Sequence, residues 1–307
     1  MKVLVTGGAG FIGSSLVDRL IEKGHEVIVV DNLSVGKFSN LNTNAKFYQR
    51  DITDSQLLNQ LFELEKPEIV YHLAAQTLLR VSIEDPLHDA KTNFIGTLSV
   101  LEACRKNSVK KIIYTSTGGA RVGEPDYLPV DEKHPIRPSS PYGISKHSAE
   151  HYVQAYEELY GLDHLILCFG NVYGPRDPPD CKRIVPTFMN LIKNGETPKI
   201  FGDGTNTRDY IYVIDLVNFM VECINKSSPT KLFHLANGKE ISVNQIFDIL
   251  RNVSGFDGEA QRVSEIKGEV KKIVLDIRLA QQELGWNPVT NIESGIQKTW
   301  EWLNNQS

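Results

Sequence analysis

Tyr142 and Lys146 stand four residues apart within the segment Ser-Pro-Tyr-Gly-Ile-Ser-Lys at 140–146. Residues with this spacing share one face of a helix. An ammonium group beside a phenol lowers the pKa of the phenol, ordinarily about 10, toward neutrality. A tyrosine tuned in this way can take a proton from a substrate hydroxyl while hydride leaves the same carbon. Because Tyr-x-x-x-Lys often arises by chance, this reading depends on whether the chain also binds a hydride acceptor.

A glycine cluster near the N-terminus predicts that acceptor. Gly7, Gly10 and Gly13 follow an apolar run and precede a helical pattern, which is the context of a dinucleotide-binding turn. Glycines let the backbone approach a pyrophosphate, whose charge the helix N-terminus stabilises. Asp31 ends the next apolar run. A carboxylate there accepts hydrogen bonds from the adenosine ribose and repels a 2′-phosphate, so the sequence favours NAD over NADP.

The elements that must position these residues alternate along the first half of the chain. Continuous apolar strands separated by helices predict a parallel sheet that is covered on both faces, a Rossmann-type doubly wound α/β fold. Strands are predicted at 2–5, 26–30, 46–50, 69–73, 111–115 and 164–168, and helices at 11–23, 55–64 and 93–107.

The second half has a different texture. A turn-rich stretch at 174–179 is followed by short helices, short strands and loops. We expect an NAD-binding domain at 1–170 and a smaller mixed α/β substrate-binding domain at 171–307. A strand near 233–236 is expected to rejoin the first sheet.

Composition excludes several classes of protein. The chain has 307 residues, 41% of them hydrophobic, which is ordinary for a globular protein. Its net charge of -5 does not indicate the basic surface that nucleic-acid binding requires. No apolar stretch approaches the roughly 20 residues that span a bilayer. The four cysteines lack CxxC spacing, and His147 and His151 lack further ligand residues. We therefore expect a cytoplasmic protein without disulfides or a structural metal.

Short motifs in a fixed order extend this interpretation. Together they resemble the extended short-chain dehydrogenase/reductase family, in particular the NAD-dependent nucleotide-sugar epimerases related to UDP-glucose 4-epimerase. The resemblance covers nearly the whole chain. It is carried by residues 6–13, 31–34, 51–52, 72–75, 93, 115–120, 141–146, 171–176, 202–204, 207–210 and 284–288.

The resemblance implies roles for single positions. Thr117, or alternatively Ser116, would bond the reacting sugar hydroxyl beside Tyr142, and Lys146 would hold the nicotinamide ribose. Cofactor contacts are implied at Gly7, Gly10, Phe11, Ile12, Gly13, Asp31, Asn32, Ser34, Gly36, Asp51, Ile52, Leu73, Ala74, Ala75, Asn93, Thr115, Tyr142 and Lys146. Contacts with the nucleotide sugar are implied at Thr117, Tyr142, Asn171, Val185, Phe201, Arg208, Lys267 and Ile273.

The implied reaction is reversible inversion at C4 of a UDP-hexose through a 4-keto intermediate, with NAD retained between cycles. UDP-glucose and UDP-galactose are expected first. In relatives, one residue of the pocket limits the size of the C2 substituent, and Ile273 stands at that position. It is neither the tyrosine linked to glucose and galactose nor the small cysteine or serine linked to N-acetylated sugars. N-acetylhexosamines remain open, and Arg121 near the active site leaves open a uronic acid. Relatives also pair two helices between subunits, which implies a homodimer.

Other reactions stay open as alternatives. Dehydratases of the family carry an Asp-Glu pair after the active-site threonine, where this chain has Gly118 and Gly119. A decarboxylase, a reductase or a non-catalytic NAD-binding sensor is also compatible with the fold. Three positions depart from the family pattern: Val122 replaces a tyrosine, and Cys168 and Lys267 replace arginines.

Overall fold

The larger part of the molecule is built on one parallel sheet. The structure is a computed structural model that describes residues 1–265 and 270–306. Seven strands lie in the order β10-β6-β5-β4-β1-β2-β3, and each neighbouring pair is parallel. This confirms the predicted fold class. The strands are β1 (Lys2–Thr6), β2 (Glu26–Asp31), β3 (Lys46–Gln49), β4 (Ile69–His72), β5 (Lys111–Thr117), β6 (Asp163–Phe169) and β10 (Leu232–Leu235).

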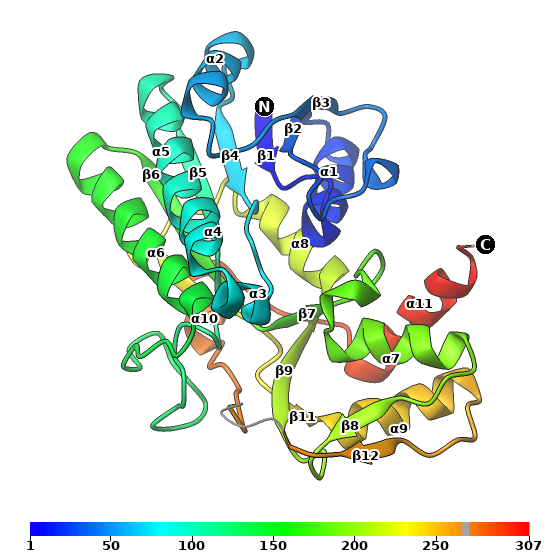
Figure 1. The fold of residues 1–307 in the computed structure, drawn as a ribbon. Coiled ribbons are helices and arrows are strands. Elements are labelled where there is room, and N and C mark those ends of the chain that lie inside the picture. The colour runs from blue at the N-terminus through cyan, green and yellow to red at the C-terminus, as the bar shows by residue number, and fades with distance from the viewer. Residues whose placement is uncertain (266–269, 307) are drawn as a thin grey trace.

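Helices cover both faces of this sheet (Figure 1). Side chains alternate along β1, so that Val3 and Val5 pack with Leu16 on one face while Leu4 packs with Leu58 on the other. The first face carries α1 (Phe11–Glu22), α8 (Val213–Glu222) and α10 (Arg278–Leu284). The second carries α2 (Ser55–Glu65), α5 (Gly96–Lys106) and α6 (Pro141–Tyr160).

A smaller unit lies beside the carboxyl ends of the strands (Figure 1). Its helices are α7 (Ile184–Lys193), α9 (Val243–Ser254) and α11 (Ile292–Asn304). Its strands are β7 (Asn171–Tyr173), β9 (Thr207–Tyr212) and β11 (Glu240–Ser242) in one sheet, and β8 (Lys199–Phe201) and β12 (Gln261–Val263) in another. The three helices share one core, where the Phe188 and Phe247 ring centroids are 6.2 Å apart.

The chain passes repeatedly between the two units. After β9 it returns to the large sheet as α8 and β10, and β10 pairs with β6. A loop of the large unit also pairs with a late segment of the chain. Val130 N donates to Val274 O at 2.8 Å, and Asp276 N donates back to Val130 O at 2.7 Å. The two units are thus joined through several segments of main chain.

One predicted helix begins earlier than expected. The structure has α3 (Leu79–Glu84), α4 (Pro86–Ala90) and a π-helical turn at Lys91–Ile95 before α5, so the chain over the predicted range 93–107 is helical but starts within the π-helical turn. The turn carries Asn93, whose side-chain Oδ1 accepts from Gln76 N and whose Nδ2 donates to Gln76 O. Single π-helical turns of this kind are frequent at functional sites. None of the helices in the described chain has the length and apolar character of a membrane span.

Candidate active site

The end of β5 and the start of α6 bring the predicted catalytic residues together. Ser140 caps α6, because its Oγ accepts a bond from Gly143 N at 3.2 Å. Pro141 suits the first helical position, so Tyr142 lies in the first turn and Lys146 one turn later. Lys146 is 3% exposed, whereas Tyr142 is half-buried. A substrate could therefore reach the tyrosine while the lysine stays shielded from water.

Thr117 and Ser116 point in different directions, as successive residues of a strand must. The Ser116 hydroxyl donates to Glu150 Oε1 on the helix side of the sheet. Thr117 Oγ1 accepts from Ala120 N at 3.3 Å and shares a hydrogen bond with Tyr142. Of the two hydroxyls that the sequence leaves open, Thr117 is the one beside the phenol.

Burial dominates the electrostatics of this pair. It raises the pKa of Tyr142 to about 12, although the Thr117 hydrogen bond opposes the rise. Burial also lowers the pKa of Lys146 to about 7. The expected lowering of the Tyr142 pKa by Lys146 is therefore wrong for the protein alone. Low-dielectric surroundings disfavour both charged forms, and Lys146 Nζ lies over the Tyr114 ring, 4.2 Å from its centroid.

A buried carboxylate that the sequence analysis missed supports the start of α6. Asp89 is fully buried, and its Oδ2 accepts from Ser145 Oγ at 2.6 Å. Its Oδ1 accepts from Gln76 Nε2 at 2.9 Å and from Asn93 Nδ2 at 3.0 Å. Asn93 therefore belongs to a network behind the catalytic helix. An aspartate in an amphipathic helical pattern gives no sequence signal for such a position.

The glycine turn has the shape that a dinucleotide requires. A Cβ on Gly13 would lie 2.1 Å from Gly7 O, so only glycine allows α1 to start this close to β1. At Gly10, by contrast, the only neighbour within 4 Å of such an atom would be Gly7 O, at 3.2 Å. Gly10 begins α1 without a side-chain cap, and unbonded N–H groups there suit an anion. Phe11 and Ile12 are the first two residues of the helix.

Asp31 is fixed at the end of β2. Its Oδ2 accepts from Ala9 N at 3.0 Å, and its Oδ1 accepts from Leu33 N at 2.8 Å. The carboxylate retains lone pairs for a ribose, and Gly36 passes so close that a Cβ there would lie 2.9 Å from Asp31 Oδ1. These residues fit an NAD molecule without a 2′-phosphate.

The remaining predicted cofactor residues line the same edge of the sheet. Asn32 Nδ2 donates to Asp51 Oδ2 at 2.9 Å, and Ser34 N donates to Asn32 Oδ1 at 3.0 Å. Ile52 is buried against Gly96. Leu73, Ala74 and Ala75 follow β4, and the backbone of Ala74 faces Gly7. Thr115 differs from the rest, because its hydroxyl donates to His72 O at 3.1 Å and so links β5 to β4 within the sheet.

The smaller unit brings fewer of its predicted residues to this place. Ile273 packs over Gly119, where a Cβ would lie 3.4 Å from Ile273 Cγ2. Arg208 Nη1 donates to Thr207 O at 2.8 Å. Lys267 lies outside the described residues. Of the others, Asn171 and Phe201 are exposed, and Val185 is buried in the core of the smaller unit.

Arg183 is a second residue that the sequence analysis missed. It stands at the N-cap of α7, with its guanidinium 5.6 Å from the centre of the Phe11 ring. Its Nε donates to Asp177 Oδ1 at 2.9 Å, and its charge lowers the pKa of Tyr142 against the larger effect of burial. A cation therefore faces both the glycine turn and the catalytic tyrosine. No spacing in the turn-rich segment signals this.

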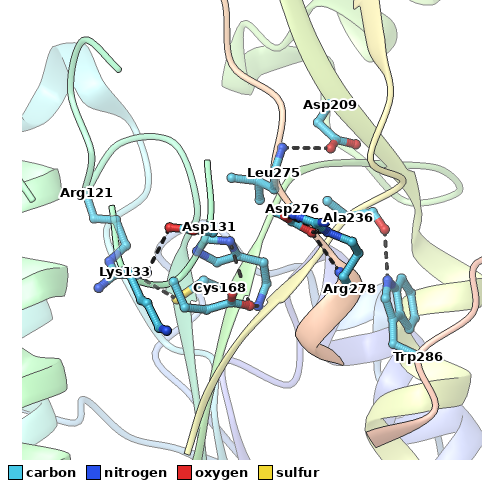
Figure 2. Close-up of polar contacts among 12 residues, drawn as sticks. Arg121, Asp131, Lys133, Cys168, Asp209, Ala236, Leu275, Asp276, Arg278 and Trp286 are labelled. Carbon is cyan, nitrogen blue, oxygen red and sulfur yellow. Dashed lines mark hydrogen bonds and ion pairs between the residues drawn. The ribbon is translucent and has the colours of Figure 1, made fainter. Parts of the chain in front are cut away.

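Arg121 does not lie where a substrate carboxylate could use it. It is 4% exposed, and its Nη2 lies 3.0 Å from Glu150 Oε2. Its Nη1 contacts Cys168 Sγ at 3.8 Å (Figure 2). Arg121, which left a uronic acid substrate open, is therefore already paired with Glu150 in this structure. Among the described residues no group of acidic, histidine or cysteine side chains could hold a metal ion.

Known proteins resemble this chain over its whole length. The family model for GDP-mannose 4,6 dehydratase matches residues 4–299. The UDP-glucose 4-epimerase of Mycolicibacterium smegmatis is 39% identical over 313 residues, covering all of both chains. A Thermotoga maritima UDP-glucose 4-epimerase solved with UDP-glucose is 44% identical, with a TM-score of 0.97 over 99% of each chain. The Thermus thermophilus enzyme solved with NAD is 35% identical, with a TM-score of 0.94 over all of both chains. The chain therefore belongs to the extended short-chain dehydrogenase/reductase family, among its NAD-dependent epimerases and dehydratases of nucleotide sugars.

Proposed function

We propose that this protein is a UDP-hexose 4-epimerase that interconverts UDP-glucose and UDP-galactose with NAD that it keeps bound, and so serves galactose metabolism. The observation that supports the proposal is that Thr117 ends β5 and is hydrogen-bonded to Tyr142 at the start of α6, at the same carboxyl edge of the sheet where the glycine turn follows β1. Ligands of open α/β sheets bind at that edge.

The residues that would hold NAD are those of the glycine turn together with Asp31 and Lys146. The N-terminus of α1 would receive the pyrophosphate, and Asp31 the adenosine ribose. When bound there, NAD accepts a hydride from a carbon and can give it back.

The chain itself would handle the proton. Tyr142 would take the proton of the 4-hydroxyl group, and would later return it to the C4 oxygen when hydride is returned to the opposite face of the 4-keto sugar. With a pKa of about 12 in the protein alone, the phenol needs positive charge nearby to ionise near neutral pH. Lys146 and Arg183 are the cations in place to supply it. Thr117 would hold the hydroxyl that reacts.

Binding energy should concentrate on the nucleotide, because the sugar must turn between the two half-reactions. Arg208, Asn171 and Lys267 are proposed for the diphosphate, and Val185 and Phe201 for the uracil. Ile273 would limit the pocket at the C2 substituent, since it lies over Gly119 two residues from Thr117. We place UDP-glucose and UDP-galactose first and N-acetylhexosamines second.

The packing around Gly118 argues against a dehydratase. A Cβ at this position would lie 2.3 Å from Leu275 Cδ1 and 3.0 Å from Phe169 O. An acidic side chain after Thr117 would therefore meet atoms already in place. A uronic acid substrate loses its support because Arg121 is paired with Glu150. A non-catalytic sensor would not need a buried lysine under a tyrosine.

We further propose a homodimer. Exposed apolar side chains occur on α3, α4, the π-helical turn and α6, and these elements contact one another (Figure 1). Such patches are typical of subunit contacts. They comprise Leu79, Ile83, Leu87, Ile144, Tyr152 and Leu159, with Ile95 of the π-helical turn. A cytoplasmic location is proposed with it, since three of the four free thiols are buried and none is in a disulfide.

The decisive experiment is incubation of the purified protein with UDP-galactose and no added cofactor. We expect UDP-glucose without net NADH, and no product from Tyr142→Phe. Absence of product from the unaltered protein, with and without added NAD, would rule out this substrate pair. UDP-N-acetylhexosamines and UDP-uronic acids would then be tried under the same conditions.

A further inference from the structure

Glu150 is a buried carboxylate with three side-chain contacts. Its side chain is 2% exposed. Arg121 Nη2 lies 3.0 Å from its Oε2, and His147 Nδ1 lies 2.9 Å from the same oxygen. The Ser116 hydroxyl donates to its other oxygen, Oε1. A buried charge with this many partners needs an explanation beyond packing.

The position of this carboxylate links the two elements that carry the active site. Glu150 follows Lys146 by four residues on α6, so both lie on one face of the helix. Ser116, which it bonds, precedes Thr117 on β5. Glu150 therefore joins the catalytic strand to the catalytic helix and holds a negative charge one turn from the catalytic lysine.

We infer that Glu150 is a positioning residue that acts through Lys146, and that Arg121 sets how much of its negative charge Lys146 feels. The inference rests on the proposed role of Lys146 in the active site. A charged lysine can hold a ribose and favour the ionised form of Tyr142, whereas a neutral one cannot attract the phenolate. Glu150 would keep the lysine charged although its surroundings exclude water.

The electrostatics agree with the geometry. Burial lowers the pKa of Lys146 to about 7, and the negative charge of Glu150 is the largest effect that opposes it. Cys168 and Asp89 oppose it less. Arg121 Nη2 lies 3.0 Å from Glu150 Oε2, so its cation offsets the negative charge of Glu150. Its Nη1 contacts the Cys168 thiol (Figure 2).

All the titratable or charged groups around Lys146 enter the test. They are Asp89 from α4, His72 from β4, Tyr114 from β5, Cys168 from β6, Tyr142, His147 and Glu150 from α6, Arg121 from the loop after β5, and His234 from β10, which interacts with Arg121 and Glu150. His72 is not a competing switch near neutral pH, because burial and the charge of Lys146 lower its pKa to about 3.

The test reads the charge of Lys146 directly. Protein labelled with ¹⁵N-lysine is titrated between pH 5 and 10, roughly the range expected for a perturbed lysine, and the Lys146 signal is identified by its loss in Lys146→Met. We expect Glu150→Gln to lower the midpoint by about one pH unit. The double variant Arg121→Met/Glu150→Gln should bring it back toward the value of the unaltered protein, because both charges are then gone.

The design separates this role from a structural one. Removing one member of a buried ion pair can impair folding, but replacing both is often tolerated, so the double variant keeps the test available. Glu158→Gln is the matched control, since Glu158 is an exposed carboxylate on the same helix. An unchanged midpoint in Glu150→Gln, or an equal fall in the single and double variants, would overturn the inference. The readout needs no turnover, so it stands even if UDP-galactose is not the substrate.

Discussion

Leu275 lies so close to Gly118 that a Cβ added to the glycine would come within 2.3 Å of Leu275 Cδ1. This contact predicts that the chain cannot be converted to a dehydratase by the obvious exchange. Gly118→Asp with Gly119→Glu should release no dehydrated 4-keto sugar and should reduce stability by about 1–3 kcal/mol through overpacking. Mass spectrometry of the nucleotide sugars, with thermal unfolding, checks both points. Gly119→Ala is the matched control, because a Cβ there meets only ordinary contacts with Ile273.

The two neighbouring hydroxyls of β5 should behave differently. Thr117→Ala removes the group beside Tyr142, so we expect kcat to fall about tenfold to a hundredfold with little change in Tm. Ser116→Ala removes a donor to Glu150 and should mainly lower the stability, by about 1–2 kcal/mol. Steady-state kinetics and urea unfolding of both variants separate the two roles. Equal losses of kcat would contradict the assignment.

Burial of Lys146 should lower the free energy of unfolding near neutral pH. Its pKa is about 7 in the folded protein and about 10.5 when unfolded, so between these values the unfolded chain binds more protons. The loss of free energy of unfolding caused by Lys146 is therefore absent above the unfolded pKa of about 10.5. It grows as the pH falls and is complete below the folded pKa of about 7. Lys146→Met should be inactive yet more stable at neutral pH, by several kcal/mol at most.

Urea unfolding of Lys146→Met and the unaltered protein, both freed of cofactor, tests this linkage. The gain in free energy of unfolding should be larger at pH 7 than at pH 9.5, roughly one unit below the unfolded value. Lys110→Met is the control, because Lys110 is exposed and paired with Glu68 at the surface. A gain that does not change with pH would point to packing alone.

The exposed apolar side chains of α3, α4, the π-helical turn and α6 predict the oligomeric state. Leu87 is 82% exposed and Leu159 is 68% exposed, and burial of such side chains between subunits is favourable. Leu87→Glu with Leu159→Glu should convert a dimer to a monomer in analytical ultracentrifugation. Val289→Glu, which alters a 78% exposed valine elsewhere, should leave the mass unchanged. A monomer before any substitution would refute the proposed contact.

Much of the fold follows from local sequence patterns. Apolar runs such as Val27 to Val30 are buried on both faces, and this alone indicates a central parallel strand. The glycine turn could be located because a Cβ at Gly13 has no room beside Gly7 O. The pairing of Tyr142 with Lys146 likewise depends only on helical spacing.

The parts that sequence could not supply depend on distant contacts. Asp89 meets Ser145 across 56 positions, and Arg121 meets Cys168 across 47. The direction of the Tyr142 pKa also could not be read from spacing, because it depends on how completely the surrounding elements exclude water. The π-helical turn that carries Asn93 also could not be read from the local pattern, and Asn93 bonds the more distant Gln76.

The seventh strand of the large sheet has a consequence for synthesis of the chain. β6 ends at Phe169, but its neighbour β10 begins only at Leu232, after much of the smaller unit has been made. Until then one edge of β6, with Leu165 to Leu167 fully buried in the finished protein, has no partner. Unpaired apolar edges are templates for aggregation. The cofactor-binding half is therefore not a module that can be cut out at residue 170, and its completion waits on the half that would bind the sugar.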